Sequence, residues 1–325
     1  MTFFKTLMAA AVGSLVTFTT AAVAQDDYPN KPITLVVSFP AGGNADIIAR
    51  LNAEGLSQEL GVPVNVINVP GGGMIPAVMN VLEKPADGYT LFRWTTPSVV
   101  IGPLVRNAPY DPMADMTPIF ADETVANALY VSADSEIETF EQFIEVAKTK
   151  KMKMGVNNIG APPHLSAVQL GQEFDLEFNN LVMKTVPASL LGLVGGQVEV
   201  AVGQVGSFKT MGDEIRPLVI LDNDRKDFYE RDLPGVSTVG EVFPAKNAAT
   251  WIKGGVAVKA GTPQAVIDKL VAASEAAFTT DEFIAQVNNL TAYSWVIGVE
   301  DTTATIQEGI DLYKPFLDEL GLLAK

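Results

Sequence analysis

The segment from Phe39 to Asn44 has the composition of an anion-binding loop. Ile33 to Phe39 is a run of β-branched and apolar residues, which predicts a buried strand. The sequence Pro-Ala-Gly-Gly, Pro40 to Gly43, interrupts the run, and an amphipathic pattern begins at Asn44. A helix that starts there leaves backbone N–H groups without partners, and its dipole adds positive potential. We therefore predict that an anionic ligand group binds at this loop.

A second loop, Asn157 to Pro163, repeats this arrangement. It follows the predicted strand Met152 to Val156 and precedes a predicted helix, His164 to Phe174. Two prolines at its end are suited to the first helical turn, and the asparagine side chains and backbone N–H groups before them are suited to face an oxyanion. Both loops together would clamp an acidic ligand. The alternative is that each loop is glycine-rich only because the chain turns there, and the sequence leaves both interpretations open.

Enzyme signatures are missing from the chain. His164 is the only histidine and there is no cysteine, which argues against a catalytic triad and against a zinc site. The alternative of an all-carboxylate Ca²⁺ or Mg²⁺ site has no loop signature here. No Gly-Lys-Ser/Thr phosphate loop and no Gly-x-Ser-x-Gly elbow occurs. His164 either faces the ligand as a pH-sensitive group or bonds nearby backbone and orders its loop. We predict no enzymatic activity, no cofactor and no metal ion.

Further polar residues have two interpretations each. Thr95 and Thr96 follow a predicted strand, Tyr89 to Trp94, so their hydroxyls either enter a cleft or cap the next helix. The close acidic pairs Asp222/Asp224 and Glu230/Asp232 lie in a turn-rich segment. We predict that these carboxylates are solvated surface rather than a catalytic dyad.

The N-terminus has the form of an export signal. Lys5 precedes an apolar stretch, Leu7 to Phe18, and Ala22-Val23-Ala24 has the small-x-small pattern of a cleavage site. The apolar stretch is shorter than the roughly 20 residues that a spanning helix needs. We predict a signal peptide over residues 1–24 and a soluble periplasmic protein after cleavage near Ala24; the alternative is an N-terminal membrane anchor.

Size and charge restrict the fold and the partners. A mature chain of about 300 residues exceeds one comfortable core, which predicts two lobes. Of the 325 residues, 48% are hydrophobic and 18% charged, as in folded globular proteins, and the formal net charge is −16. That charge argues against nucleic acid and anionic membranes as partners. It does not argue against a small anion, because a local group of N–H dipoles can hold one.

Strand-like and helix-like segments alternate along the chain, which predicts an α/β fold. Besides the segments above, we predict strands at Val62 to Asn68, Ala128 to Val131, Val198 to Val202, Pro217 to Leu221 and Gly255 to Val258, and helices at Met74 to Leu82, from Thr139, from Thr262-Pro263 and from Asp301 to Leu320. No floppy linker separates two lobes, so ordered strands should connect them. We place the crossings near Asn127 to Val131 and Lys253 to Val258.

Five groups of residues resemble the receptors of the tripartite tricarboxylate transporters, also called Bug proteins. They follow in the family's order and span nearly the whole mature chain: Tyr28 to Ile33 with Phe39 to Gly43 and Ala45-Asp46; Asn68 to Gly73 through Asp87 to Leu91; Gly160 to Leu165; Gly195 to Val198; and Pro234 to Val239 with Ala260 to Pro263. Each segment is weakly specific by itself. Their joint order and spacing carry the resemblance.

The resemblance implies a two-lobed periplasmic binding protein of type II, a Venus flytrap with lobes joined by crossover strands. With the crossings placed as above, we expect lobe I at 25–128 plus 254–325 and lobe II at 129–253. It also implies a small organic acid held between the lobes and delivered to the large and small membrane subunits of a secondary permease. We expect a monomer. The alternative is a receptor that presents its carboxylate to a sensor-kinase ectodomain.

Several positions depart from the family pattern. Val182 to Thr185 stand where Pro-Tyr-Lys-Gly is frequent, Gly203-Gln204 where an acidic residue is common, and Arg93 where an apolar residue is usual. The absence of an aspartate at the Gly203 position disfavours an amino-acid ligand. With Lys184 and Gln204 included, the candidate ligand-binding residues are Phe39, Pro40, Ala41, Gly42, Gly43, Asn44, Asp46, Thr95, Thr96, Asn157, Asn158, Ile159, Gly160, His164, Lys184 and Gln204.

Overall fold

The computed structural model describes residues 27–96, 98–157, 162–183, 185–246, 251–290, 292–319 and 321–324. The predicted signal peptide lies outside the described residues. The strands are β1 Ile33–Val37, β2 Val64–Asn68, β3 Thr90–Thr95, β4 Met116–Ser132, β5 Met152–Val156, β6 Phe178–Val182, β7 Val200–Gln204, β8 Ile215–Ile220, β9 Trp251–Lys259 and β10 Tyr293–Ile297. The α-helices are α1 Asn44–Leu60, α2 Ile75–Leu82, α3 Ser98–Arg106, α4 Phe140–Thr149, α5 Pro162–Phe174, α6 Val186–Val194, α7 Phe208–Met211, α8 Tyr229–Asp232, α9 Val239–Val242, α10 Gln264–Phe278, α11 Asp281–Asn288 and α12 Val299–Glu319. Short 3-10 helices cover Gly72–Met74, Val205–Ser207 and Gly212–Glu214.

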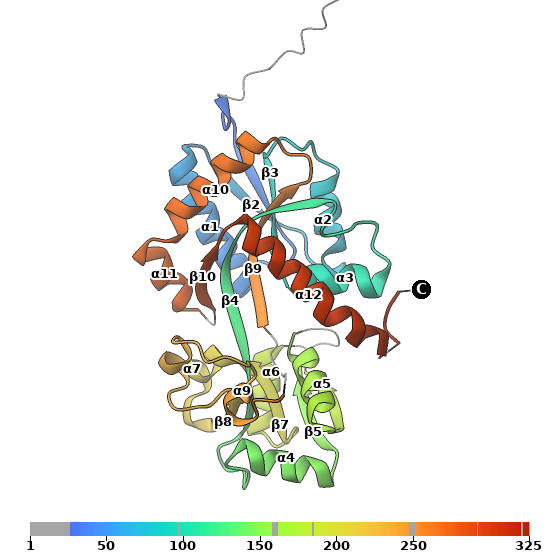
Figure 1. The fold of residues 1–325 in the computed structure, drawn as a ribbon. Helices are drawn as coiled ribbons and strands as arrows, with labels where there is room; N and C mark the ends of the chain where they lie inside the picture. Colours follow the sequence, from blue (N-terminus) through green and yellow to red (C-terminus); the bar gives the residue numbers. More distant parts are fainter. Residues whose placement is uncertain are drawn as a thin grey trace, which may run out of the picture.

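A continuous path of paired strands runs through two bodies, one above the other in Figure 1. Its order is β2-β1-β3-β9-β4-β7-β5-β6, and β8 and β10 also pair with β4. In the upper body, β1 pairs in parallel with β2 and β3, whereas β9 is antiparallel to β3 and β4. In the lower body, β5 is parallel to β6 and β7. This mixed α/β arrangement confirms the predicted fold class.

Strand β4 belongs to both bodies. Its first part, from Met116 to Ala126, pairs with β9, and its last part, from Asn127, pairs with β7 and β8. The change of partners at Ala126/Asn127 lies next to the first predicted crossing. Strand β9 pairs with β3 and β4 in the upper sheet. The second crossing, placed near Lys253 to Val258, stays a prediction. The lobe boundaries at 128/129 and 253/254 stay a prediction.

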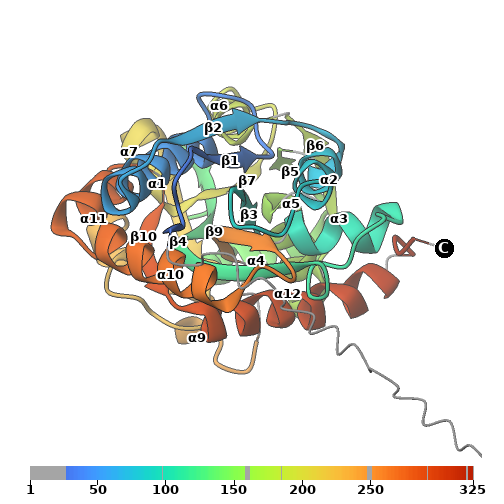
Figure 2. The ribbon, with the colours of Figure 1, turned by 90° about the horizontal axis from the view of Figure 1, so that it is seen from above.

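Hydrophobic cores cover both faces of each part of the sheet. Seen from above in Figure 2, the upper strands lie between α1, α10 and α11 on one side and α2 and α3 on the other. Ile48 and Leu56 of α1 pack with Leu270 of α10 on the first face, and Val78 of α2 packs with Trp94 on the second. The lower strands likewise pack between two clusters of buried residues.

Local patterns predicted some element ends correctly and others not. Helix α1 begins at Asn44 as predicted, β5 has the predicted bounds, and the Thr139 hydroxyl caps α4 by accepting from Gln142 N. For the helix predicted from Thr262-Pro263, we expect Thr262 to be the N-cap, because proline is favoured at the first helical position. This is wrong, because Pro263 is the N-cap of α10 and the Thr262 hydroxyl donates to Lys259 O at 2.7 Å. Strands β6 and β10 and helix α11 were not predicted, since their patterns are short or irregular.

Candidate functional site

The N-terminus of α1 has no side-chain cap. Gly43 is its N-cap residue, with extended backbone at φ −82° and no side-chain cap hydrogen bond. The first N–H groups of an α-helix have no acceptor within the helix, and here no N-cap side chain supplies one. The positive end of the helix dipole lies at the same place and favours a negative charge there. The geometry is that of an anion site.

Asp46 holds this loop in shape. One of its carboxylate oxygens accepts from Gly42 N at 2.8 Å and from Arg50 Nε at 3.0 Å, and the other accepts from Asn68 Nδ2 at 2.8 Å. Asn68 Nδ2 also donates to Phe39 O at 3.0 Å. Burial raises the pKa of the Asp46 carboxyl, but these hydrogen bonds outweigh burial and the pKa is lowered. Asp46 therefore stays ionised and ties both ends of the loop together.

A cavity of about 340 Å³ lies in front of the α1 N-terminus. Both bodies contribute to its wall. The upper body provides Phe39, Pro40, Gly43, Asn44, Ala45, Thr95, Thr96, Ser98, Glu123, Val125 and Ile252, and the lower body provides Asn157, Pro162, Pro163, Val186 and Gln204. Its volume suits a small organic molecule.

The wall from the lower body differs from the predicted second anion site. Pro162 and Pro163 are the first residues of α5 and line the cavity with their rings. Proline has no N–H, so these two positions donate no hydrogen bond. The polar side chains that the described residues of the lower body place on this wall are Gln204, at the end of β7, and Asn157, whose buried Oδ1 has no hydrogen-bond partner among them. An amide in this position can turn to present either its oxygen or its nitrogen.

Some of the candidate ligand-binding residues predicted from the sequence line this cavity. Those on its wall are Phe39, Pro40, Gly43, Asn44, Thr95, Thr96, Asn157 and Gln204. Ala41, Gly42, Asp46 and His164 are not among the lining residues, and Asn158, Ile159, Gly160 and Lys184 lie outside the described residues. Contact of any of these residues with a ligand stays a prediction.

Two of the predicted site residues, His164 and Thr96, are buried in the protein. His164 is buried, and burial lowers the pKa of its imidazole, so the ring is neutral at pH 7. The Thr96 hydroxyl accepts from Lys253 N at 3.0 Å and donates to Lys253 O at 3.3 Å, and Thr96 N also donates to that carbonyl at 2.8 Å. Thr96 therefore ties the end of β3 to β9.

The residue that sequence reasoning missed is Glu123. It lies on β4, is 4% exposed and lines the cavity. Its Oε1 accepts from Arg93 Nη2 at 2.6 Å, and Arg93 Nη1 donates to Asp122 Oδ1 at 2.6 Å. Burial, and next the Asp122 carboxylate, raise the pKa of Glu123 to about 7, although Arg93 opposes them. Because one guanidinium faces two carboxylates, this cluster has an excess negative charge when both are ionised.

The signal for Glu123 was present in the sequence. Arg93 stands out as a charged residue inside an apolar strand, and a buried arginine requires a buried acceptor. Asp122 and Glu123 are likewise charges between the apolar segments Ile119–Ala121 and Val125–Ala126. Local pattern could not show that the two segments meet across β9.

The acidic pairs near α8 are only partly solvated, so that prediction is wrong for Asp222 and Asp232. Asp222 accepts from the Tyr229 hydroxyl, and Asp232 Oδ2 accepts from the Tyr293 hydroxyl at 2.7 Å. Both carboxylates are buried. Asp224 and Glu230 are exposed, as predicted.

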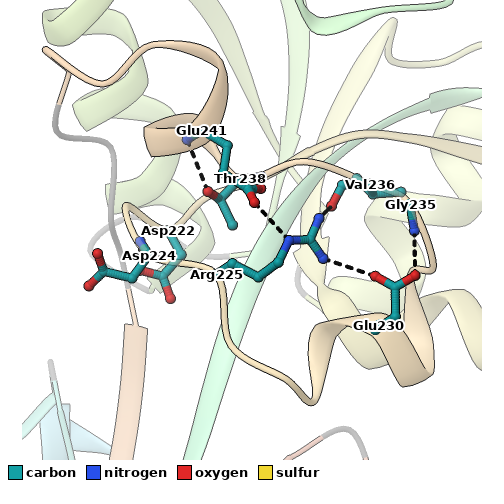
Figure 3. A network of polar contacts seen from close by, with 8 residues as sticks. All are labelled: Asp222, Asp224, Arg225, Glu230, Gly235, Val236, Thr238 and Glu241. Carbon is teal, nitrogen blue, oxygen red and sulfur yellow. Dashed lines mark hydrogen bonds and ion pairs between the residues drawn. The ribbon is translucent and has the colours of Figure 1, made fainter.

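Arg225 organises the segment around these residues (Figure 3). Its guanidinium donates to Glu241 at 2.8 Å, to Glu230 at 3.0 Å and to the carbonyl of Val236 at 2.8 Å. Thr238 and Glu241 form the capping box of α9. These contacts fold the turn-rich segment and engage its carboxylates within the protein.

The described residues were also compared with the requirements of a metal site and of a membrane-spanning helix. Among the described residues, no cluster of three histidine or acidic side chains is placed to ligate a metal. No described helix combines the length and the apolar character needed to cross a bilayer.

The model of the tripartite tricarboxylate transporter family receptor matches residues 48–322. The chain belongs to this family. It is a family of binding proteins, so the receptor is a solute-binding protein and not an enzyme.

Individual proteins are similar to this chain in sequence and in fold. The receptor is 28% identical to a UPF0065 protein of Bordetella pertussis over 302 residues, which cover 91% of this chain and 92% of that protein. A solute-binding protein of the same family from Polaromonas superposes with a TM-score of 0.79 at 23% identity, covering 90% of this chain and 99% of the other. The Rhodopseudomonas palustris protein Rpa4515, solved with adipate, gives a TM-score of 0.76 at 26% identity, covering 92% and 99%.

Proposed function

We propose that this receptor captures a small organic acid in the periplasm and delivers it to the two membrane subunits of a secondary permease. The observation that carries the proposal is the uncapped N-terminus of α1, which lies on the wall of a cavity closed on its other side by the lower body. A carboxylate placed there accepts hydrogen bonds from backbone N–H groups and lies at the positive end of the helix dipole.

The ligand class is supported by a relative. Rpa4515 was solved with adipate, a carboxylate, and shares the fold of this receptor at 26% identity. The cavity wall here contains no lysine, arginine or histidine among the described residues. The proposed anchor for the anion is therefore backbone, and it needs no basic side chain.

Capture proceeds by closure of two lobes, 25–128 with 254–325 and 129–253. Strand β4 passes from one body to the other and changes partners at Ala126/Asn127, so a small backbone rotation there turns one lobe against the other. The ligand enters the open cleft, docks on the α1 N-terminus, and is covered by Asn157, Pro162 and Pro163. Closure excludes water, which strengthens the hydrogen bonds to the carboxylate.

Gly43→Asp tests the anchor. A Cβ at Gly43 meets only Pro40 O at 3.6 Å, and its φ of −82° suits any residue, so the substitution introduces no strain. Aspartate is a favourable N-cap, and its carboxylate would occupy the N–H groups that the ligand requires. We expect unchanged or raised thermal stability and carboxylate affinity weakened about 100-fold or more.

Gly43→Ala is the matched control, because it adds the same Cβ without a carboxylate, and it should retain affinity. Binding is measured by thermal shift and calorimetry against mono-, di- and tricarboxylates. Equal affinity in the Asp and Ala variants, or no binding of any acid to the wild type, would contradict the proposed function.

Delivery is tested in cells. Deleting the receptor should abolish uptake of the bound acid while leaving transcriptional responses to that acid intact. The opposite result, with normal uptake and a lost response, would favour a receptor that serves a sensor kinase.

A further inference from the structure

We infer that Glu123 is a specificity-determining residue that binds a protonated amine of the ligand, so that the captured acid is a zwitterion with a carboxylate at one end and an ammonium group at the other. This inference rests on the proposed function, since it assumes that α1 holds the carboxylate. It assigns the second polar end of the ligand, which neither the family nor the relatives specify for this chain.

The geometry of Glu123 leaves one oxygen for a ligand. Arg93 Nη2 engages Oε1, and Oε2 has no hydrogen-bond partner among the described residues. The side chain is almost fully buried, yet it lies on the cavity wall. A carboxylate oxygen on a cavity wall that receives no donor from the protein can accept one from the ligand, and a charge-assisted hydrogen bond of this kind is stabilising.

The charge of the cluster favours a cationic donor. Arg93 is shared between Glu123 and Asp122, and Asp122 Oδ2 accepts from Asn52 Nδ2 at 2.6 Å. One positive and two negative groups leave one negative charge uncompensated. An ammonium group at Oε2 makes the cluster neutral, whereas a second ligand carboxylate would add repulsion.

The other residues of the cavity wall are compatible with a cationic ligand group at Glu123. Glu123 is the one ionisable side chain among the described lining residues, and the buried Asn157 Oδ1 is a second acceptor without a partner among them. The cavity thus has backbone donors at the α1 end and, away from it, one carboxylate among neutral side chains. This is the pattern that a zwitterion complements.

Glu123 changes one expectation from the sequence. The absence of an acidic residue at the Gly203 position disfavours an amino-acid ligand, but Glu123 provides a carboxylate from another strand. A Cβ at Gly203 would meet Tyr130 Cε2 at 3.2 Å and Leu190 Cδ2 at 3.3 Å, and Gly203 is not on the cavity wall. In this chain, the carboxylate that lines the cavity comes from β4.

Gly254 of β9 makes the space for this arrangement. A Cβ at Gly254 would lie 2.3 Å from Glu123 Oε1 and 2.8 Å from Arg93 Nη2. The missing side chain lets β9 pass between β3 and β4 while the ion pair crosses it. The register agrees with this placement, since Glu123 lies opposite Gly254.

Matched ligands test the inference on the purified, exported protein. The probes are β-alanine, γ-aminobutyrate and ε-aminocaproate, with alanine for an ammonium group next to the carboxylate. Each ω-amino acid is compared with the acid in which a methyl group replaces the ammonium group (butyrate, valerate, heptanoate) and with the dicarboxylate of equal carbon number (malonate, succinate, adipate). Alanine is compared with isobutyrate and methylmalonate. We expect one of the amino acids to bind about 10- to 100-fold more tightly than both of its counterparts.

Glu123→Gln should remove that preference, so that the amino acid binds no more tightly than its methyl-ended counterpart. The variant keeps the oxygen that Arg93 engages and leaves Arg93 balanced by Asp122, so the fold is retained. A dicarboxylate that binds as tightly as the amino acid, or a preference that survives in Glu123→Gln, would overturn the inference. Loss of all acid binding in Gly43→Asp is a separate result that concerns only the anchor.

The pH dependence in the wild type is a second readout. The charged groups that face Glu123 are Arg93 from β3 and Asp122 from β4, while β9 and β10 place Gly254 and Ser294 opposite it. An ammonium ligand requires ionised Glu123, so its affinity should rise between about pH 6 and pH 8. A dicarboxylate that shares a proton with Glu123 would show the reverse trend, and that trend in the preferred ligand would contradict the inference.

Discussion

The hydroxyl of Tyr293 donates a hydrogen bond to Asp232 Oδ2 over 2.7 Å, and both side chains are buried. Tyr293 is on β10, which pairs with the upper part of β4, whereas Asp232 ends α8 in the lower body. Phe228 stacks on the Tyr293 ring at a centroid distance of 4.1 Å. This contact joins the two bodies beside β4.

Tyr293→Phe should therefore lower the free energy of unfolding by about 1–3 kcal/mol, because Asp232 loses a buried donor. Urea denaturation measures the change. Tyr110→Phe is the matched control, since the buried Tyr110 hydroxyl has no hydrogen-bond partner among the described residues and its removal should cost nothing. Equal effects of the two substitutions would show that the bond to Asp232 adds no stability.

The lowered pKa of the Asp232 carboxyl predicts that part of the free energy of unfolding depends on pH in the acid range. Burial raises the pKa of Asp232, but hydrogen bonds from Arg231, Tyr293 and Lys209 outweigh burial and lower it below its ordinary value near 3.8. The ionised form is thus favoured by folding, and its contribution is present above pH 3.8 and lost as the pH falls through the lowered pKa. The stability difference between the wild type and Asp232→Asn should shrink across that range. A difference that stays constant with pH would contradict this.

Arg93→Met should destabilise the protein by about 3–5 kcal/mol at neutral pH, since it leaves two buried carboxylates without their cation. The loss should become smaller as the pH falls from about 8 to about 6, because protonation of Glu123 then relieves the repulsion. Adding Glu123→Gln to Arg93→Met should recover part of the stability. Chemical denaturation of the single and double variants measures this coupling, and strictly additive effects would argue against it.

Gly254→Ala should be destabilising, and it should weaken ligand binding, because its Cβ would overlap Glu123 Oε1. We expect a loss of about 2–3 kcal/mol from the forced displacement of a buried ion pair. Gly298→Ala is the control, since a Cβ there meets nothing within 4 Å. The melting temperatures of both variants are compared with that of the wild type, with and without a bound acid. A Gly254→Ala protein as stable as the wild type would show that the Arg93–Glu123 ion pair can move aside without cost.

Features that depend on neighbours in the chain could be predicted from the residues alone. A β-branched run, a glycine turn and an amphipathic pattern placed β1 and the start of α1, and the strand bounds of β5 followed from composition and flanking turns. The family followed from ordered motifs. These features are local, because strand periodicity, turn chemistry and capping act over a few residues.

Which polar groups meet depends on the folded arrangement of the strands. Arg93 and Glu123 are 30 positions apart, and only the register of β3 and β4 against β9 brings them together across Gly254. The same holds for the hydrogen bond between Asp46 and Asn68, which are 22 positions apart, and for α5, which contributes proline rings to the cavity wall. Long-range strand pairing has no local signature, so the charge of the cavity became visible only in the folded chain.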